Sequence, residues 1–148
     1  MAKKSYKQKT EITCGPAVMH LILKKLKLKP LLSEKHLVKL MFTNKKIGTK
    51  DAQFPRIAEK FKLDYIVGRK NSTIPELKTA LKSKFHVIVC YYIKAEKTGH
   101  YAIVNKIDKK YIHLEDPYFG NIKYSLNYFK KIWHGSRTYK GWYIGIKR

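Results

Sequence analysis

The sequence lacks a long apolar segment, a secretory signal and a set of paired cysteines. Its longest apolar run, Val87 to Ile93, is far shorter than the roughly 20 residues that a membrane-spanning helix requires. The basic N-terminus carries no apolar signal segment, so we expect a cytoplasmic location. Two cysteines are too few for a disulfide framework. With no repeat or flexible linker, residues 1–148 are expected to form one domain, with a flexible basic arm at residues 1–7.

Acidic residues are also scarce. Ten Asp and Glu stand against 33 Lys and Arg, which gives a formal net charge of +23. Such a charge attracts nucleic acid, anionic lipid head groups or acidic peptides. The lysines are spread from Lys3 to Lys147 and form no single stripe with aromatic residues, so nucleic-acid binding is not expected. Peripheral membrane contact on the cytoplasmic side stays open.

The spacing of apolar residues predicts a helical first half and a β-rich second half. Helices are expected from Pro16 to about residue 28, over 33–41, over 51–61, after the capping box that begins at Thr73, and over 125–133. Strands are expected over 86–93, 101–107, 111–115, 122–124 and 141–147. This order predicts an α+β fold in which N-terminal helices pack on a C-terminal antiparallel sheet.

Cys14 lies where the first helix is expected to begin. The positive end of a helix dipole, together with a neighbouring histidine, lowers a thiol pKa to about 3.5–7.5 from about 8.5. We therefore expect Cys14 to react as a thiolate below pH 7, with a small buried side chain as the alternative. Cys90 lies inside an apolar strand and is expected to be a buried structural residue.

His100 and Asp116 are expected to meet on one face of the sheet. If residues 108–110 form a three-residue hairpin loop, Ile107 faces Tyr111 and Ala102 faces Asp116, so that His100 lies diagonal to Asp116. Diagonal partners are about 7–8 Å apart at the backbone, within reach of an imidazole and a carboxylate. A change of one residue in the loop would put them on opposite faces. The alternative is that Asp116 merely begins a turn.

No pattern in the sequence predicts a metal or cofactor site. The six histidines form no pair with the spacing of metal ligands, and neither a CxxC nor an HExxH motif is present. Glycine-rich phosphate loops are also missing. We therefore expect chemistry by side chains alone.

Four motifs resemble the bacteriocin-processing, double-glycine leader peptidases, which are papain-like domains often fused to peptide-exporting ABC transporters. The motifs follow that family's order and cover about residues 8–146. They are Gln8 six positions before Cys14-Gly15-Pro16-Ala17, then Gly48-Thr49, then Gly99-His100-Tyr101-Ala102-Ile103-Val104, then Asp116-Pro117 with Gly120. Thr13 stands where many relatives have Asp, and the family's transporter segments are missing from this sequence, so we expect a stand-alone version.

The resemblance implies a papain-like cysteine peptidase that cleaves after a Gly-Gly leader motif. It implies Cys14 as nucleophile, His100 as general base, Asp116 as the residue that orients His100, and Gln8 as oxyanion donor. The expected partners are a peptide or protein substrate, with an acidic leader suited to the basic surface, and a separately encoded ABC transporter. Two alternatives remain: a papain-like amidase or acyltransferase, and a non-catalytic basic module that binds nucleic acid or acidic proteins.

Overall fold

The computed structural model describes residues 13–136 and 138–148 of the chain. The predicted basic arm at residues 1–7 and Gln8 lie outside the described residues. The helices are α1 (Cys14–Lys25), α2 (Glu34–Leu40), α3 (Gln53–Lys60), α4 (Ile74–Lys82) and α5 (Leu126–Ile132). The strands are β1 (Asp64–Gly68), β2 (His86–Ile93), β3 (Thr98–Ile107), β4 (Tyr111–Asp116), β5 (Gly120–Ser125) and β6 (Tyr143–Lys147).

Local capping fixes where several helices begin. Ser33 accepts a hydrogen bond from the backbone N–H of His36 and caps α2, as its position predicts. Thr73 and Glu76 form the predicted capping box at the start of α4. Helix α1 begins at Cys14 itself, with Pro16 in its first turn. The predicted placement of Cys14 at a helix N-terminus is therefore confirmed.

The strands form one antiparallel sheet in the order β1-β6-β2-β3-β4-β5. The predicted strand over residues 86–93 matches β2. The sequence prediction missed β1, a five-residue strand that pairs along its whole length with β6. As a result β6, the last strand along the chain, lies inside the sheet between β1 and β2.

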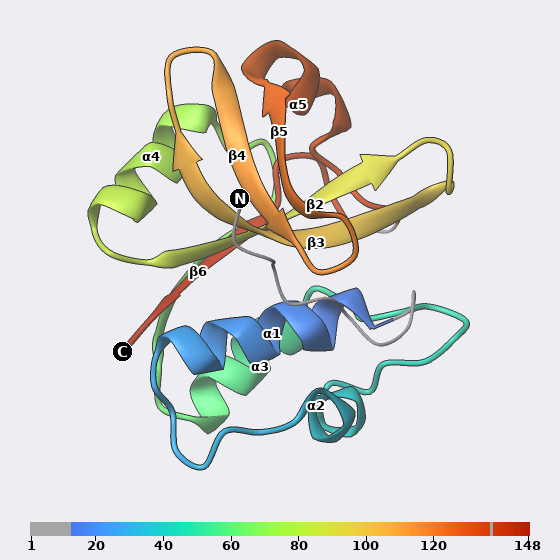
Figure 1. Ribbon diagram of the computed structural model, residues 1–148, viewed down its shortest axis with the longest axis vertical. Coiled ribbons are helices and arrows are strands. Elements are labelled where there is room, and N and C mark those ends of the chain that lie inside the picture. The colour runs from blue at the N-terminus through green and yellow to red at the C-terminus, as the bar shows by residue number, and fades with distance from the viewer. Residues whose placement is uncertain (1–12, 137) are drawn as a thin grey trace.

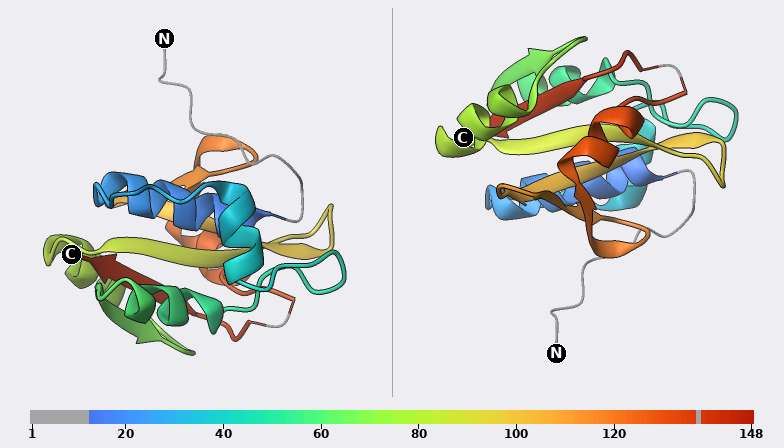
Figure 2. Two further views of the ribbon diagram at one scale, coloured as in Figure 1. Left: turned by 90° about the horizontal axis from the view of Figure 1, so that it is seen from below. Right: turned by 90° about the horizontal axis from the view of Figure 1, so that it is seen from above.

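Helices cover both faces of the sheet, and each face has its own core. Helices α1, α2 and α3 share a core with Ile88, Ile103, Ile144 and other side chains of one sheet face. Helices α4 and α5 pack against the opposite face of the sheet, where the strand residues that alternate with those of the first core point. In Figures 1 and 2, α1 and α5 accordingly lie on opposite sides of the central strands. The α+β prediction is confirmed. Across the described residues, no helix has both the length and the apolar character needed to span a bilayer.

The predicted loop between β3 and β4 is wrong by one residue. Ile107 pairs with Ile112 rather than with Tyr111. The turn is tighter than expected because the backbone N–H of Asp108 donates to the carbonyl of Tyr111 at 3.0 Å. In addition, the Asp108 carboxylate accepts hydrogen bonds from the N–H groups of Lys110 and Tyr111.

A β-bulge between Val104 and Lys106 shifts the pairing of β3 with β4 by one residue. This shift restores the predicted register for the part of β3 that precedes the bulge. Beyond the bulge, Ile103 pairs with Glu115, which is the predicted alignment. His100 and Asp116 therefore lie on the same face of the sheet. Their predicted placement is confirmed, but it depends on the bulge as well as on the turn.

Candidate active site

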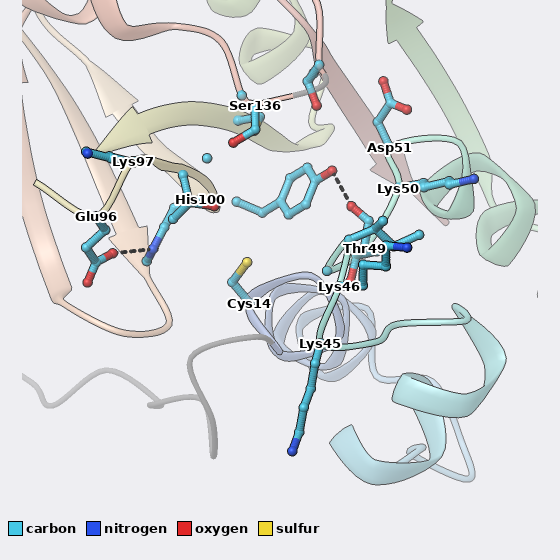
Figure 3. A pocket seen from close by; sticks show the side chains of 18 of the residues that line it. Cys14, Lys45, Lys46, Thr49, Lys50, Asp51, Glu96, Lys97, His100 and Ser136 are labelled. Atoms are coloured by element: carbon cyan, nitrogen blue, oxygen red, sulfur yellow. Dashed lines mark hydrogen bonds and ion pairs between the residues drawn. The ribbon is translucent and has the colours of Figure 1, made fainter. Parts of the chain in front are cut away.

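A cleft of about 1070 Å³ lies between the N-terminus of α1 and the near ends of β2 and β3. Cys14 and His100 both line it, and Figure 3 shows their side chains facing the same space. Most of the remaining lining comes from the loop over residues 45–52, residues 96–99 and the described residues of the segment between α5 and β6. Segments far apart in the sequence therefore enclose the sulfur and the imidazole.

The thiol of Cys14 is buried, with only 8% of the residue exposed. Burial, with a smaller contribution from the negative charge of Asp116, raises the pKa of the thiol to about 11. The backbone N–H groups of Tyr101, Gly15 and Cys14 itself point toward the sulfur and act in the opposite direction. The expectation of a lowered pKa is wrong for the arrangement in this structure, because loss of hydration outweighs the helix N-terminus.

Gly15 allows α1 to approach the loop that carries Thr49. A Cβ atom at position 15 would lie 2.4 Å from Oγ1 of Thr49, far closer than two such atoms can come. The Thr49 hydroxyl also forms a 2.6 Å hydrogen bond with that of Thr43. The Tyr101 hydroxyl donates to the carbonyl of Thr49 at 2.9 Å. The Cys-Gly-Pro and Gly-Thr motifs are therefore in direct contact, and Tyr101 ties them to β3.

Asp116 is fully buried beside His100. Its Oδ2 atom lies 3.7 Å from Nδ1 of the imidazole and accepts a hydrogen bond from the hydroxyl of Tyr91. Its Oδ1 atom accepts hydrogen bonds from the backbone N–H groups of Tyr118 and Phe119 at 2.7 and 2.9 Å. Burial by itself would raise the pKa of Asp116, but His100 and these three donors hold it below its usual value. The carboxylate is therefore ionised and firmly held.

Glu96 is a second carboxylate at the imidazole, and sequence reasoning missed it. Its Oε2 atom lies 2.9 Å from Nε2 of His100 (Figure 3). Burial lowers the pKa of His100, but Asp116 and Glu96 together outweigh this effect and raise it. The available signal was the position of Glu96, four residues before His100 in the segment between two predicted strands.

Aromatic side chains complete the surroundings of His100. The ring of Phe119 stacks on the imidazole at a centroid distance of 5.6 Å, and that of Tyr118 meets it edge-on at 6.2 Å. Both come from the turn between β4 and β5, whose N–H groups also bind Asp116. The same turn therefore holds the carboxylate and covers the imidazole, so its two functions are coupled.

Gly99 and Gly135 make room for the sulfur of Cys90. A Cβ atom at position 99 would lie 2.7 Å from Cα of Gly135 and 3.1 Å from this sulfur. Cys90 is 2% exposed, and burial raises the pKa of its thiol well above the usual range. Its prediction as a buried structural cysteine is confirmed, although it also forms part of the cleft lining.

The structure brings Cys14, His100 and Asp116 to one region, whereas Gln8 lies outside the described residues. Within residues 13–136 and 138–148, no group of three or more His, Cys, Asp or Glu side chains is arranged to hold a metal ion. The thiol of Cys14, the imidazole of His100 and the carboxylate of Glu96 line an open cleft, and the carboxylate of Asp116 is buried behind the imidazole.

A sequence model for the peptidase C39 family matches residues 2–137, which is most of the chain. The chain belongs to the peptidase C39 family. It is therefore a cysteine peptidase, and its α+β architecture is the papain-like fold of this family. No curated protein sequence gives a significant match to this C39 peptidase.

Solved structures share the fold of this C39 peptidase over nearly its whole length. The peptidase domain of Streptococcus ComA, described as a bi-functional ABC transporter involved in quorum sensing, has 22% identity and a TM-score of 0.75, with 99% of this chain and 98% of that chain covered. A double glycine motif protease from an AMS/PCAT transporter, solved with its leader peptide, has 19% identity and a TM-score of 0.66, with coverages of 99% and 92%. A C39-like peptidase from Bacillus anthracis has 10% identity and a TM-score of 0.71, with coverages of 99% and 98%.

Proposed function

We propose that this C39 peptidase cleaves a peptide bond after a Gly-Gly leader motif, with Cys14 as its nucleophile. The observation that carries the proposal is the convergence of Cys14 and His100 on one cleft, with Asp116 behind the imidazole. The Gly-Gly specificity is supported by the structural similarity to a double glycine motif protease that was solved with its leader peptide.

In the proposed reaction His100 removes the proton from the Cys14 thiol, and the resulting thiolate attacks the peptide carbonyl. The carbonyl oxygen becomes an oxyanion, for which Gln8 is the proposed side-chain donor. His100 then gives its proton to the leaving amine, which releases the C-terminal part of the substrate. Water hydrolyses the remaining thioester and restores the thiol. Asp116 holds the ring of His100 and stabilises its positive charge throughout.

The charge around the cleft suits an acidic leader. Four lysines line it, against the two carboxylates of Asp51 and Glu96. These lysines are Lys45, Lys46, Lys50 and Lys97. We propose that they attract acidic side chains of the leader on its way to the cleft. We further propose that the substrate comes from the cytoplasm and is exported by a separately encoded ABC transporter.

The direct test uses a synthetic leader that ends in Gly-Gly and is followed by a short cargo peptide. We expect mass spectrometry to find a single cut after the second glycine, and none with Cys14→Ala. A matched peptide with Val-Val in place of Gly-Gly should stay intact. Cleavage by Cys14→Ala at the wild-type rate would overturn the role of the thiol. Loss of the side-chain amide from glutamine residues, without any leader cleavage, would favour an amidase or acyltransferase instead.

A second experiment tests the lysines separately from the chemistry. With Lys45 and Lys46 both changed to Gln, kcat/KM for an acidic leader should fall by about 3–10-fold at low salt. A leader with its acidic residues changed to Gln or Asn is the control, because it should lose much less. Equal losses for both leaders would show that the lysines do not recognise acidic side chains.

A further inference from the structure

The C-terminal ends of three helices meet at one end of the molecule, away from the cleft. Arg148 donates a hydrogen bond to the carbonyl of Leu26 at the end of α1, at 2.8 Å. Lys147 donates to the carbonyl of Ser83 at the end of α4, at 3.3 Å. Asp64, which follows α3 closely, pairs with Lys147 across β1 and β6. Figures 1 and 2 accordingly show the C-terminus on the same side of the molecule as the end of α1.

This end of the molecule is strongly basic. Nine Lys and Arg but only two carboxylates lie in the segments that meet here, residues 24–27, 59–64, 81–86 and 145–148. Three helix C-termini contribute a partial charge of about −0.5 each, so nine cations far exceed what the helix dipoles can offset. We call this surface the basic end. Its cations are Lys24, Lys25, Lys27, Lys60, Lys62, Lys82, Lys84, Lys147 and Arg148, and all except Lys147 are exposed.

Three of these lysines occupy positions that glycine normally takes. Lys27, Lys62 and Lys84 follow the ends of α1, α3 and α4, with φ values of 57°, 57° and 70°. In each case the N–H of the next residue donates to the carbonyl five residues before it, which is the Schellman pattern. A positive φ strains the backbone of any residue that has a Cβ atom. The basic end therefore has three cations at places where backbone conformation alone favours glycine.

A pocket of about 390 Å³ opens on the basic end. Its polar lining consists of Lys25, Lys84, His86 and Asn105, and within the described residues it contains no carboxylate. Glu115, outside the pocket, holds Lys25 at 3.4 Å. Burial lowers the pKa of His86, and the charge of Lys25 lowers it further. Two ammonium groups beside a neutral imidazole and an amide suit the oxygens of a phosphate. The apolar part of the wall comes from Leu81, Phe85, Ile103 and Val104.

These features fit the surface of an anionic membrane better than a nucleic acid. Among the described residues, the exposed large apolar and aromatic side chains all lie outside the four segments of the basic end. The basic end therefore offers no platform on which bases could stack. Anionic lipids attract clustered Lys and Arg without stacking. The pocket also combines cations with an apolar wall, which suits a phosphate that is attached to a lipid.

We propose that the basic end docks this C39 peptidase on a membrane surface rich in anionic phospholipid, and that the pocket of Lys25, Lys84 and His86 binds one head-group phosphate. Helix α1 begins at Cys14 in the cleft and ends at the basic end. Its 12 residues span about 18 Å. The docked protein therefore holds its cleft away from the lipid, where a water-soluble peptide can reach it.

The test measures sedimentation of the protein with vesicles and needs no leader peptide. The wild type should bind vesicles of phosphatidylcholine that contain phosphatidylglycerol, and should not bind vesicles of phosphatidylcholine alone. Changing Lys27, Lys62 and Lys84 together to Gly should lower the partition coefficient by about 10–100-fold, because each lysine near an anionic surface contributes about fivefold. Urea denaturation should show no loss of stability, because glycine relieves the backbone strain. Lower stability with unchanged vesicle binding would mean that these lysines only stabilise the helix ends, and would overturn the proposal.

A matched control removes three charges at the cleft instead. Lys45→Gln, Lys46→Gln and Lys97→Gly together change the net charge equally, and Lys97 also has a positive φ, of 52°. This variant should keep vesicle binding within about threefold of the wild type. Equal losses in the two triple variants would overturn the basic end as the docking surface. Tighter binding to a DNA duplex than to the anionic vesicles at the same salt concentration, abolished by the three glycines, would assign the basic end to nucleic acid instead.

The pocket is tested with dihexanoyl phosphatidylglycerol, a short-chain soluble lipid. Nuclear magnetic resonance of the ring protons should show that the pKa of His86 rises when this lipid is present, because a phosphate beside the neutral ring favours its charged form. An unchanged pKa, or an equal rise with inorganic phosphate at the same concentration, would overturn the pocket as a lipid site. Vesicle binding by a protein that cleaves no leader would support the docking surface and reject the proposed substrate.

Discussion

The two sides of the cleft hold their reactive groups by different means. On the helix side, Cys14 is positioned by steric fit, because Gly15 lies directly against Thr49. On the sheet side, His100 is positioned by charge, because the buried carboxylate of Asp116 is surrounded by donors. The first side should tolerate a change of polarity that preserves shape, whereas the second should not. Conversely, a change in side-chain size should disturb the helix side more than the sheet side.

The largest expected effect comes from Asp116→Asn, which preserves shape and removes charge. The amide cannot stabilise a positively charged His100, so we expect kcat/KM to fall by about 10²–10⁴-fold on a leader substrate. Steady-state cleavage assays measure this loss, and circular dichroism confirms that the variant is folded. Activity within twofold of the wild type would show that the charge of Asp116 is not what positions His100.

Tyr91→Phe tests the same side through the group behind the carboxylate. Losing the hydrogen bond to Asp116 should lower the free energy of unfolding by about 1.5–3 kcal/mol. The folded-state pKa of Asp116 is depressed, so its contribution to stability is present above its unfolded pKa and is lost as the pH falls through the folded value. In Tyr91→Phe this folded pKa rises, and the loss on acidification should begin at a higher pH. Urea unfolding between pH 2 and pH 7 measures both changes, and coincident curves for the two proteins would contradict the prediction.

Gly15→Ala tests the helix side by adding a single methyl group. Because the new Cβ would lie 2.4 Å from Thr49 Oγ1, helix and loop must move apart. We expect a loss of about 1–3 kcal/mol in the free energy of unfolding, measured by urea denaturation. Adding Thr49→Gly should recover part of this loss, because it removes every atom of Thr49 in the clash. Gly15→Ala with wild-type stability would mean that the fit is looser than the structure indicates.

The smallest effect is expected from Thr49→Val, which preserves shape on the helix side. It removes the hydrogen bond with Thr43 and little else, so the free energy of unfolding should fall by about 0.5–1.5 kcal/mol. The same urea titration measures this change, with cleavage activity close to wild type. A loss of activity as large as that of Asp116→Asn would remove the contrast between the two sides.

Much of the fold could be predicted because its signals are local. The capping box of Thr73 and Glu76 and the cap at Ser33 each depend on neighbouring residues, and both are formed as expected. Strand β1 was missed because it is short, lies at the edge of the sheet and pairs with a strand from the far end of the chain. The bulge after Val104 was missed for a related reason, since only the pairing of two whole strands reveals it.

The candidate site was predicted where a motif marks it and missed where packing decides it. Cys14, His100 and Asp116 stand in recognisable patterns. The hydroxyl of Tyr91 is hidden in an apolar strand, and only its pairing opposite His100 places it near Asp116. The direction of the Cys14 pKa was wrong because the burial of the thiol depends on segments that approach α1 only in the folded protein.

The position of β6 within the sheet has a consequence for biosynthesis. Strand β1 pairs with β6, and β6 also joins β1 to β2, so the sheet remains divided until residues 143–147 have left the ribosome. Trp142 is synthesised just before residues 143–147. It packs against Phe54 and Tyr101 in the core beside the cleft. Because its long-range pairings form last, a nascent chain cannot complete the core beside the cleft until β6 is available.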